Sequence, residues 1–246
     1  MSLAATYLGA NGWLLEFDAM RVLVDPWLKG DLSFPPGAWL LRGELGEERD
    51  VPPELDLLLL TQGLADHAHP ATLEALPRGL PVVGSASAAR VVQRLGFQTI
   101  TGLQPGESVT HGELSIQATA GAPVPTVENG YLLEHRSGSL YLEPHGFLDP
   151  SLPKQQLDAV ITPMVDLGLP VAGAFVKGCS VVPQLVDRFQ PTTVLASTSG
   201  GDVRFDGVLS RMLQMQGSVA DTAKQLPAKT RCIDSQPGER YLLSAN

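Results

Sequence analysis

The stretch Leu57–Pro70, LLLLTQGLADHAHP, decides the interpretation of the whole chain. The run Asp56–Thr61 predicts a strand buried on both faces, because so short a continuous apolar run suits the inside of a sheet. Pro70 is tolerated in a first helical turn, so a helix is expected over Ala71–Leu76. The polar turn between them therefore lies at the carboxyl end of an inner strand, where layered α/β proteins collect ligands and catalytic groups.

Length and composition describe an ordinary globular protein. The chain has 246 residues, of which 43% are hydrophobic and 17% charged, so it can bury a substantial core. We interpret residues 1–246 as a single domain, because neither a linker nor a repeat interrupts them. The formal net charge of −9 argues against a nucleic-acid partner, since binding to phosphates needs a basic face.

Two further features bear on the compartment. Cys179 and Cys232 are far apart and form no CxxC pair, which makes a reducing compartment the default expectation. The first residues, MSLAATYLGANGW, lack the layout of a signal peptide, and no apolar run approaches the roughly 20 residues that span a bilayer. The sequence therefore predicts a cytoplasmic protein that does not associate with membranes.

Short strands dominate the chain on both sides of the opening stretch. Alternation and tight turns predict strands at Ala4–Gly9, Trp13–Phe17, Arg21–Asp25, Leu80–Val83, Gln98–Thr101, Glu107–Thr110, Glu113–Ala120, Tyr131–His135, Ser139–Glu143, Leu157–Thr162, Thr192–Ser197, Thr230–Asp234 and Tyr241–Leu243. Helical spacing predicts helices at Ser85–Leu95, Ser180–Phe189, Asp206–Gln214 and Ser218–Gln225. Three stretches without a clear period are expected to be loops: Gly30–Pro53, a candidate lid or pocket wall, Gly121–Asn129 and Pro163–Gly178.

These elements favour two mixed β-sheets with helices on the outer faces, an αββα sandwich of the α+β class, over a doubly wound parallel sheet. The order of the motifs resembles the metallo-β-lactamase superfamily, in the branch of small lactonase-like and UlaG-like hydrolases. The resemblance covers nearly the whole chain. It is carried by Tyr7–Gly9, Gly12–Leu14, Val22–Trp27, Leu59–Thr61, Asp66-His67, Asn129–Tyr131, Leu140–Leu142, Gly173–Phe175 and Pro237–Glu239.

The resemblance implies metal-dependent hydrolysis. That family holds one or two metal ions, usually zinc, through a THxHxDH turn, because zinc needs three or four deprotonated ligands and then activates a bound water. Thr61, Asp66 and His67 match this turn. Gln62 and Leu64 stand where its first two histidines are expected.

Other ligand positions of the family also depart from its pattern. The region Ala120–Ala122 lacks the histidine of a later loop, and Pro144 stands where a bridging aspartate is expected. Hydroxyl residues at Ser197–Ser199 replace the last histidine. We therefore expect no standard two-metal site.

A rebuilt site with one zinc or other divalent ion is the first of three hypotheses. Asp66, His67, His69 and His145 would be its ligands, because an aspartate and two histidines are adequate for zinc or iron. The alternative is structural: Asp66 would cap the helix that begins near Pro70, and the histidines would be hydrogen-bonded loop residues.

The second hypothesis keeps catalysis but needs no metal. His67 or His145 would act as a general base that Asp66 or Glu143 orients. The segment Ser197–Asp202 would supply N–H donors or an anion nest, although short Ser- and Gly-containing loops are common on surfaces.

The third hypothesis is a catalytically inactive scaffold that binds a small molecule or a protein partner. If the protein is an enzyme, the resemblance implies hydrolysis of an ester, lactone or phosphodiester by an activated water. Asp66, His67 and His145 are then the predicted catalytic residues. The predicted pocket-lining residues are Asn11, Asp25, Trp27, Gln62, Glu143 and Thr198. The resemblance implies that Asp25 supports the turn from behind, and the alternative is that it only caps the end of its strand.

Overall fold

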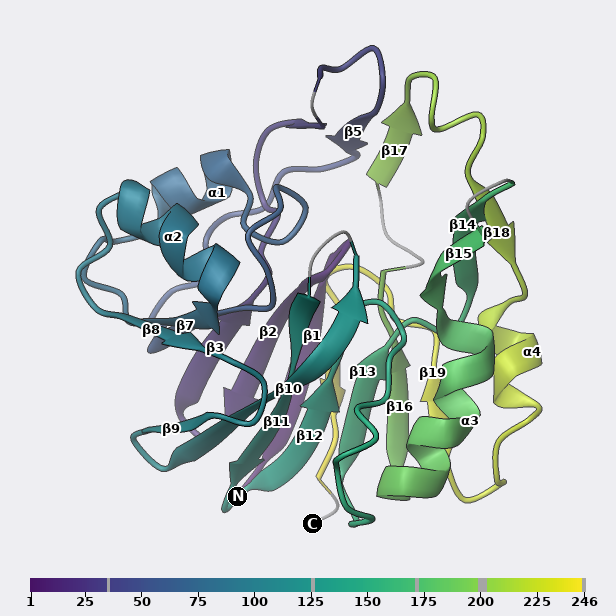
Figure 1. Ribbon diagram of the computed structural model, residues 1–246. Helices are drawn as coiled ribbons and strands as arrows, with labels where there is room; N and C mark the ends of the chain where they lie inside the picture. The colour runs from purple at the N-terminus through teal and green to yellow at the C-terminus, as the bar shows by residue number, and fades with distance from the viewer. Residues whose placement is uncertain (35, 125–126, 171–172, 199–202, 245–246) are drawn as a thin grey trace.

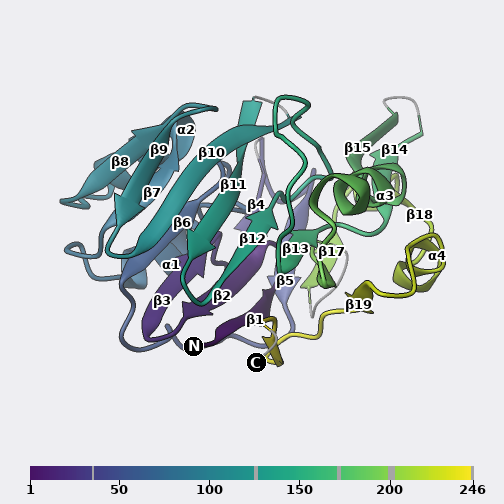
Figure 2. The same cartoon turned by 90° about the horizontal axis from the view of Figure 1, so that it is seen from below.

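A computed structural model describes residues 1–34, 36–124, 127–170, 173–198 and 203–244. Two mixed sheets lie face to face, and helices cover their outer surfaces (Figures 1 and 2). The first sheet runs in the order β20 (Arg240–Leu242), β1 (Leu3–Gly9), β2 (Gly12–Phe17), β3 (Met20–Val24), β6 (Leu57–Leu60), β7 (Val82–Ser85) and β8 (Ile100–Leu103). The second runs in the order β19 (Arg231–Ile233), β16 (Thr193–Ala196), β13 (Ala159–Thr162), β12 (Gly138–Leu142), β11 (Val127–His135), β10 (Leu114–Pro123) and β9 (Ser108–His111).

Each sheet is antiparallel in one half and parallel in the other. The strands β1, β2 and β3 are antiparallel neighbours, whereas β3, β6, β7 and β8 are parallel. The helices α1 (Pro70–Ala75) and α2 (Ala86–Arg94) lie outside the first sheet, and α3 (Gly178–Phe189) and α4 (Val219–Ala223) outside the second. The predicted αββα sandwich is confirmed, while the prediction of a single domain stays a prediction.

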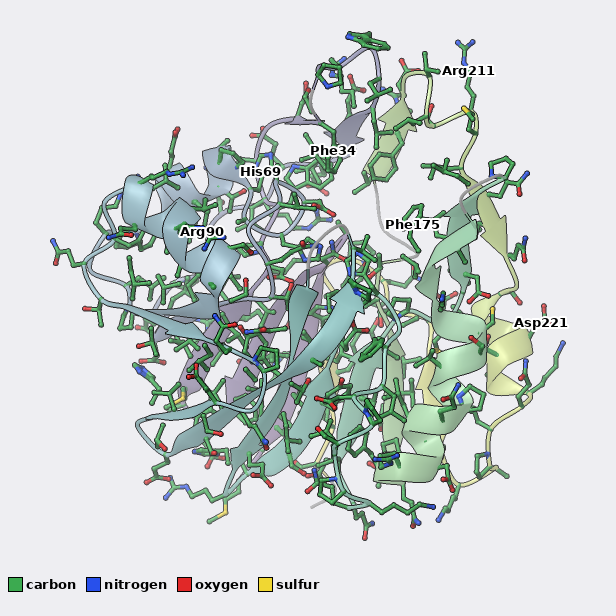
Figure 3. All side chains as sticks on the ribbon, viewed as in Figure 1. Phe34, His69, Arg90, Phe175, Arg211 and Asp221 are labelled. Atoms are coloured by element: carbon green, nitrogen blue, oxygen red, sulfur yellow. The ribbon has the colours of Figure 1, made fainter. Side chains whose placement is uncertain are left out.

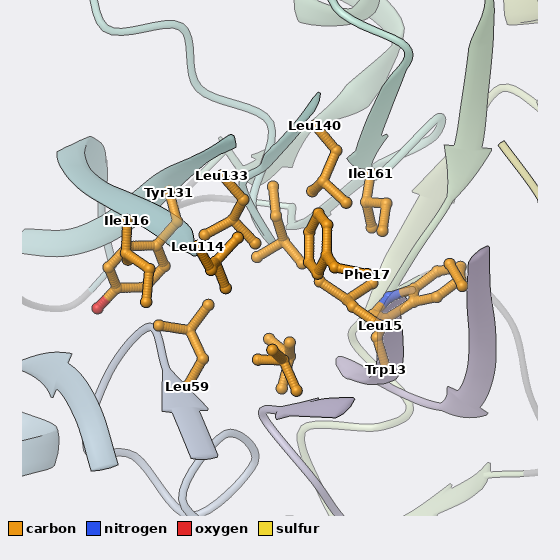
Figure 4. Packing of buried hydrophobic residues seen from close by; sticks show 14 of the residues in the cluster. Trp13, Leu15, Phe17, Leu59, Leu114, Ile116, Tyr131, Leu133, Leu140 and Ile161 are labelled. Atoms are coloured by element: carbon orange, nitrogen blue, oxygen red, sulfur yellow. The ribbon is translucent and has the colours of Figure 1, made fainter. Parts of the chain in front are cut away.

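The main core lies between the two sheets (Figure 4). Side chains alternate across a strand, so Trp13, Leu15 and Phe17 of β2 all point to the same side. They are fully buried in a cluster that includes Leu133 and Ile161 of the opposite sheet. The predicted alternation therefore builds the core, and it leaves the strand ends to carry polar groups.

The inner strand of the opening stretch forms as predicted. All four residues of β6 are buried, and β6 pairs in parallel with β3 on one side and β7 on the other. The helix after the turn begins at Pro70, but Asp66 is not its cap. The ring of His69 caps it instead by accepting a hydrogen bond from the amide of Thr72, so the predicted capping role of Asp66 is wrong.

Two small sheets project from one end of the sandwich and were not predicted. One consists of β15 (Gly173–Lys177), β14 (Asp166–Leu169) and β18 (Gln214–Gln216), and the other of β17 (Val203–Asp206), β5 (Arg42–Leu45) and β4 (Leu32–Ser33). Figure 1 shows both beyond the ends of the main strands. We call these two sheets together the lid.

The lid corrects three predictions. Gly30–Pro53 and Pro163–Gly178 contain strands rather than only loop, and no helix forms over Asp206–Gln214. Only the end residues of that last segment join strands, Asp206 in β17 and Gln214 in β18, and the residues between them form turns. The amides of Val208 and Leu209 donate to the distant carbonyl oxygens of Trp39 and Leu40, and these contacts override the local helical spacing. A fourth correction concerns Gly121–Asn129, where β10 and β11 extend into the predicted loop.

No helix in the described part of the chain is long and apolar enough to cross a bilayer. The cytoplasmic location stays a prediction.

The buried carboxylate of Asp149 ties the loop after β12 to β10, and it generates a prediction about stability. It accepts hydrogen bonds from the Ala120 amide at 2.8 Å and from the Ser151 hydroxyl at 2.6 Å. Burial raises the pKa of Asp149, but the hydrogen bonds from Ser151 and Ala120 outweigh burial and lower it. Since hydrogen bonds to charged groups are worth about 2 kcal/mol each, Asp149→Asn should lower the free energy of unfolding by about that amount at pH 7.

Urea denaturation at several pH values measures this effect. A carboxylate with a lowered pKa in the folded state stabilises the fold above its unfolded pKa, and this contribution disappears as the pH falls through the folded value. The difference in the free energy of unfolding between wild type and Asp149→Asn should therefore shrink as the pH falls below 3.8, the ordinary pKa of an aspartate. Asp187→Asn, which removes an exposed pair with Lys154, is the control and should change stability little. A difference in the free energy of unfolding that stays unchanged at low pH would contradict this role of the charged Asp149 carboxylate.

Candidate functional site

Asp25 joins the ends of two parallel strands. It directly follows β3, and its carboxylate accepts hydrogen bonds from the Thr61 amide at 2.8 Å and the Thr61 hydroxyl at 2.5 Å, just beyond β6. The same carboxylate accepts a third hydrogen bond from His67 Nδ1 at 2.8 Å. Asp25 has a φ of 40°, a left-handed conformation that aspartate tolerates better than most residues. Asp25 therefore supports the turn from behind, and it does not line the cavity described below, where the sequence prediction placed it.

His67 is fully buried, and both of its ring nitrogens face polar groups. Nδ1 donates to Asp25, while Nε2 lies 3.2 Å from Asn11 Nδ2 and 3.4 Å from Asp66 Oδ2. Burial alone would lower the pKa of His67, but the carboxylates of Asp66 and Asp25 raise it well above its usual range. A charged imidazole in this place is held between two carboxylates.

Asp66 is the member of this group that reaches open space. Burial raises the pKa of its carboxyl, but the charge of His67 and its hydrogen bond outweigh burial and lower that pKa. Oδ2 faces His67, whereas the buried Oδ1 accepts no hydrogen bond from the described residues. Buried acceptors are almost always satisfied, so Oδ1 points to a donor such as a bound water or ligand.

His145 comes to the same place from the other sheet. Its ring centroid lies 5.3 Å from that of His67. The loop that carries it is held by the buried carboxylate of Glu143, which accepts hydrogen bonds from the amides of Ala122, His145 and Phe147. Glu143 therefore positions His145 through the backbone and does not line the cavity described below.

Asn11 and Thr198 connect the two sheets above these groups. The Thr198 hydroxyl lies 2.9 Å from both Asn11 Oδ1 and the Pro144 carbonyl oxygen, and the Thr198 amide donates to Ala10. Ala10 and Thr198 have φ values of 48° and 67°. A β-branched residue in the left-handed region is strained by about 1–3 kcal/mol, and such strain is typical of functional sites.

These residues lie at the polar end of a cavity of about 330 Å³. Its polar lining consists of Asn11, Asp66, His145 and Thr198. The rest of its lining is apolar: Ala10, Trp27, Leu32, Phe34, Leu41, Pro163, Val165, Leu167, Phe175, Val176, Val203, Phe205, Leu213 and Met215. Half of these apolar residues belong to the strands of the lid, and Figure 3 shows Phe175 of β15 and Phe34, which directly follows β4. The cavity has the size and composition of a site for a small molecule.

His69 and Trp27 form a wall of this cavity. The two rings stack with centroids 5.5 Å apart, and Trp27 lines the cavity while His69 lies behind it. His69 Nε2 faces the Asp31 carbonyl oxygen at 3.2 Å, and Nδ1 accepts from Thr72. Burial lowers the pKa of His69, which favours this neutral form. The structure therefore does not bring His69 together with Asp66, although the sequence predicted both as metal ligands.

Gln62, at the position of the family's first histidine, is buried and does not line the cavity. Neither its amide oxygen nor its nitrogen has a hydrogen-bond partner among the described residues. Of the predicted Ser197–Asp202 segment, Ser197 accepts a hydrogen bond from Trp13 Nε1 at 3.1 Å, and residues 199–202 lie outside the described residues.

The fit to a metal ion can be tested on these contacts. Within the described ranges, no three His, Cys, Asp or Glu side chains come together in a way that could hold one. His67 turns one nitrogen to Asp25 and the other to Asn11 and Asp66, so it is already engaged on both sides. The described residues therefore do not fit the three-ligand site that a structural or catalytic zinc requires.

The sequence prediction named Trp27 and the segment Gly30–Pro53 as candidate pocket wall, but it missed the rest of the apolar lining. Leu167 and Phe175 lie in a segment predicted as loop, and Phe205 and Met215 flank the predicted helix Asp206–Gln214. The alternation Ala174-Phe175-Val176 was a signal for a strand, but a single short strand does not indicate which surface it will cover.

Comparisons with known proteins match this chain to one family. The model of the β-lactamase superfamily domain matches residues 4–197. A UPF0173 metal-dependent hydrolase of Cereibacter sphaeroides is 30% identical over 149 residues, or 55% of this chain, and the match spans only 60% of that relative's length. A UPF0173 metal-dependent hydrolase of Methanopyrus kandleri is 26% identical over 201 residues, which cover 77% of this chain and 81% of the relative.

Solved structures share the fold at low sequence identity. An isothiocyanate hydrolase from Delia radicum gut bacteria has a TM-score of 0.70 and 15% identity, and the match covers 98% of this chain and 100% of that one. A metallo hydrolase from Ignicoccus hospitalis has a TM-score of 0.64 and 14% identity, with 100% of both chains covered. Likeness at this identity shows the fold, while the family match covers most of the sequence. The chain therefore belongs to the β-lactamase superfamily.

Proposed function

We propose that the protein is a hydrolase with an eroded metal site, which cleaves uncharged esters or lactones at the polar end of the cavity. The names of the curated relatives support the hydrolase class. The observation that carries the proposal is the meeting of Asp66 and His145 in the lining of one largely apolar cavity. The narrower placement among UlaG-like and lactonase-like hydrolases belongs to the same proposal.

The two cavity-facing groups have distinct roles in the proposed reaction. Asp66 Oδ1, which accepts no hydrogen bond from the described residues, holds the attacking water. His145 takes a proton from this water as its oxygen attacks the carbonyl carbon, and returns it to the leaving alkoxide. The products are a carboxylic acid and an alcohol. His67 acts from behind by holding Asp66 in place at 3.4 Å.

The charge of the cavity favours an uncharged substrate over a phosphodiester. No lysine or arginine is among the described residues that line the cavity. The carboxylate of Asp66, whose pKa is lowered by His67, adds a negative charge at the reacting end. A phosphodiester anion would be repelled by this carboxylate and would meet no lysine or arginine in the described lining, whereas enzymes of phosphoryl transfer place positive charge around the phosphate.

The relatives' names raise the question of a divalent ion. A single ion held by Asp66, His67 and His145 is how metal dependence would carry over to this chain. The described residues do not fit that arrangement, because the nitrogens of His67 face Asp25, Asn11 and Asp66. We therefore route no step of the reaction through a metal.

A second candidate is a catalytically inactive scaffold that binds a small molecule in the same cavity. It is supported by the departures from the family's ligand pattern at Gln62 and Leu64, which the described structure does not compensate with a new three-ligand cluster. The two candidates share the cavity and differ in turnover.

Hydrolysis of a panel of p-nitrophenyl esters and lactones tests the proposed reaction. His145→Ala should lower kcat/KM by about 100-fold or more, because a general base typically contributes that much. Asp66→Asn keeps the size of the side chain and removes its charge, and it should lower kcat/KM by a similar factor.

The control for these variants is His111→Ala, which removes a histidine on β9 outside the cavity and should leave turnover unchanged. Turnover that survives both His145→Ala and Asp66→Asn would refute the proposed site. Absence of turnover on every ester and lactone, with ligand binding retained, would favour the inactive scaffold.

Metal content gives an independent prediction. We expect protein purified without chelator to contain clearly less than one zinc, iron or manganese per chain by elemental analysis, because the described residues supply no three-ligand cluster. Treatment with a chelator should leave ester hydrolysis unchanged. One tightly bound ion per chain, lost in both Asp66→Asn and His67→Ala, would show instead that the chain retains a single-metal site.

A further inference from the structure

We infer that the substrate carries an unbranched apolar tail beside its carbonyl group. We further infer that the lid determines how long a tail the cavity can bind. The inference rests on the proposed function and names the substrate class of the same cavity. The lid contributes apolar lining residues from both of its sheets, among them Leu167 and Phe175 from one and Val203 and Phe205 from the other.

We call the apolar part of the cavity, which would hold the tail, the tail site. One wall of it is a row of packed rings. A β-carbon on Gly43 of β5 would lie 2.6 Å from Trp27 Cη2 and 3.1 Å from Phe205 Cε1, so both rings pack against this glycine. His69 stacks on the far side of Trp27, with ring centroids 5.5 Å apart. The wall is therefore a row of packed rings that runs from the α1 cap to the lid, and an extended apolar chain can lie along it.

The apolar lining continues to the outside. Phe205 and Met215 line the cavity and are also 44% and 62% exposed. Single exposed apolar side chains are common, but these two continue the lining of a cavity, and apolar surface of that kind is typical of binding sites. A tail can therefore extend from the polar end to the mouth between β17 and β18 without meeting a charged side chain among the described lining residues except Asp66.

The polar end restricts where the carbonyl group lies. All four polar lining residues, Asn11, Asp66, His145 and Thr198, belong to the main sandwich or to its loops and none to the strands of the lid. A ligand with one polar group and one apolar tail thus has a single favourable orientation. Its carbonyl faces His145 and its tail lies under the lid.

The test is a binding experiment with methyl ketones from 2-butanone to 2-octanone. These molecules carry a carbonyl group and a tail of increasing length, bear no charge and are not hydrolysed. Their dissociation constants are measured by calorimetry or by ligand-detected NMR on the full chain. Each added methylene should tighten binding about three- to fourfold until the cavity is filled, the factor that burial of one methylene supplies.

Variants of the mouth locate the tail. Met215→Glu should weaken binding of 2-octanone about tenfold or more while changing 2-butanone little, because the long tail would desolvate the new charge. Val208→Glu is the matched control: Val208 is 52% exposed on the segment between β17 and β18 but does not line the cavity. It should leave all dissociation constants unchanged, and circular dichroism confirms that both variants fold.

The outcomes separate this inference from the proposed function. Affinity that does not change with tail length, or that falls equally in Met215→Glu and Val208→Glu, would overturn the tail site even if short esters are hydrolysed. The expected length dependence without turnover of any ester would support the tail site and refute the hydrolase. The expected length dependence together with turnover that rises along the ester series would support both.

Discussion

The contact among Asp25, Thr61 and His67 is the interaction on which the site depends. Asp25 follows β3 and Thr61 follows β6, so the Asp25 carboxylate, which accepts hydrogen bonds from Thr61 and His67, fixes the ends of these two parallel strands relative to each other. The same carboxylate sets the orientation of His67. Removing one partner of such a buried, hydrogen-bonded group typically costs several kcal/mol, because the other partner is left without compensation. Asp66, which lines the cavity beside His67, is positioned through this contact.

The cavity combines a polar end, which this contact supports, with the apolar side chains of the lid. Electrostatic interactions are stronger where water is excluded, so the charges on Asp66 and His67 act at close range beneath the lid. The second sheet contributes His145 through a loop whose amides are held by Glu143. Asn11 and Thr198 join the two sheets here, so the packing of the whole sandwich sets the distance between Asp66 and His145.

Much of the fold could be predicted, and the reasons are local. The inner strand before the turn is apolar throughout, and the helix over Ser85–Leu95 has a serine at its start and a glycine after its end. Both patterns are decided by residues that are near in sequence. The segment Asp206–Gln214 was predicted wrongly because the amides of Val208 and Leu209 bond to the carbonyl oxygens of Trp39 and Leu40, which are distant in sequence. Pairing partners distant in sequence cannot be identified from one short segment.

The sequence by itself placed Asp66 and His67 in the turn after an inner strand, and it showed that Gln62 and Leu64 depart from the family's ligand pattern. The supporting role of Asp25 was implied only by the family resemblance. Only the tertiary structure decided which of the remaining polar residues join them. His69 is two residues from His67, yet it turns away to cap a helix and stack on Trp27, whereas His145 arrives from the opposite sheet. The physical reason is that a turn sends successive side chains in different directions, while the packing of two sheets brings distant strand ends together.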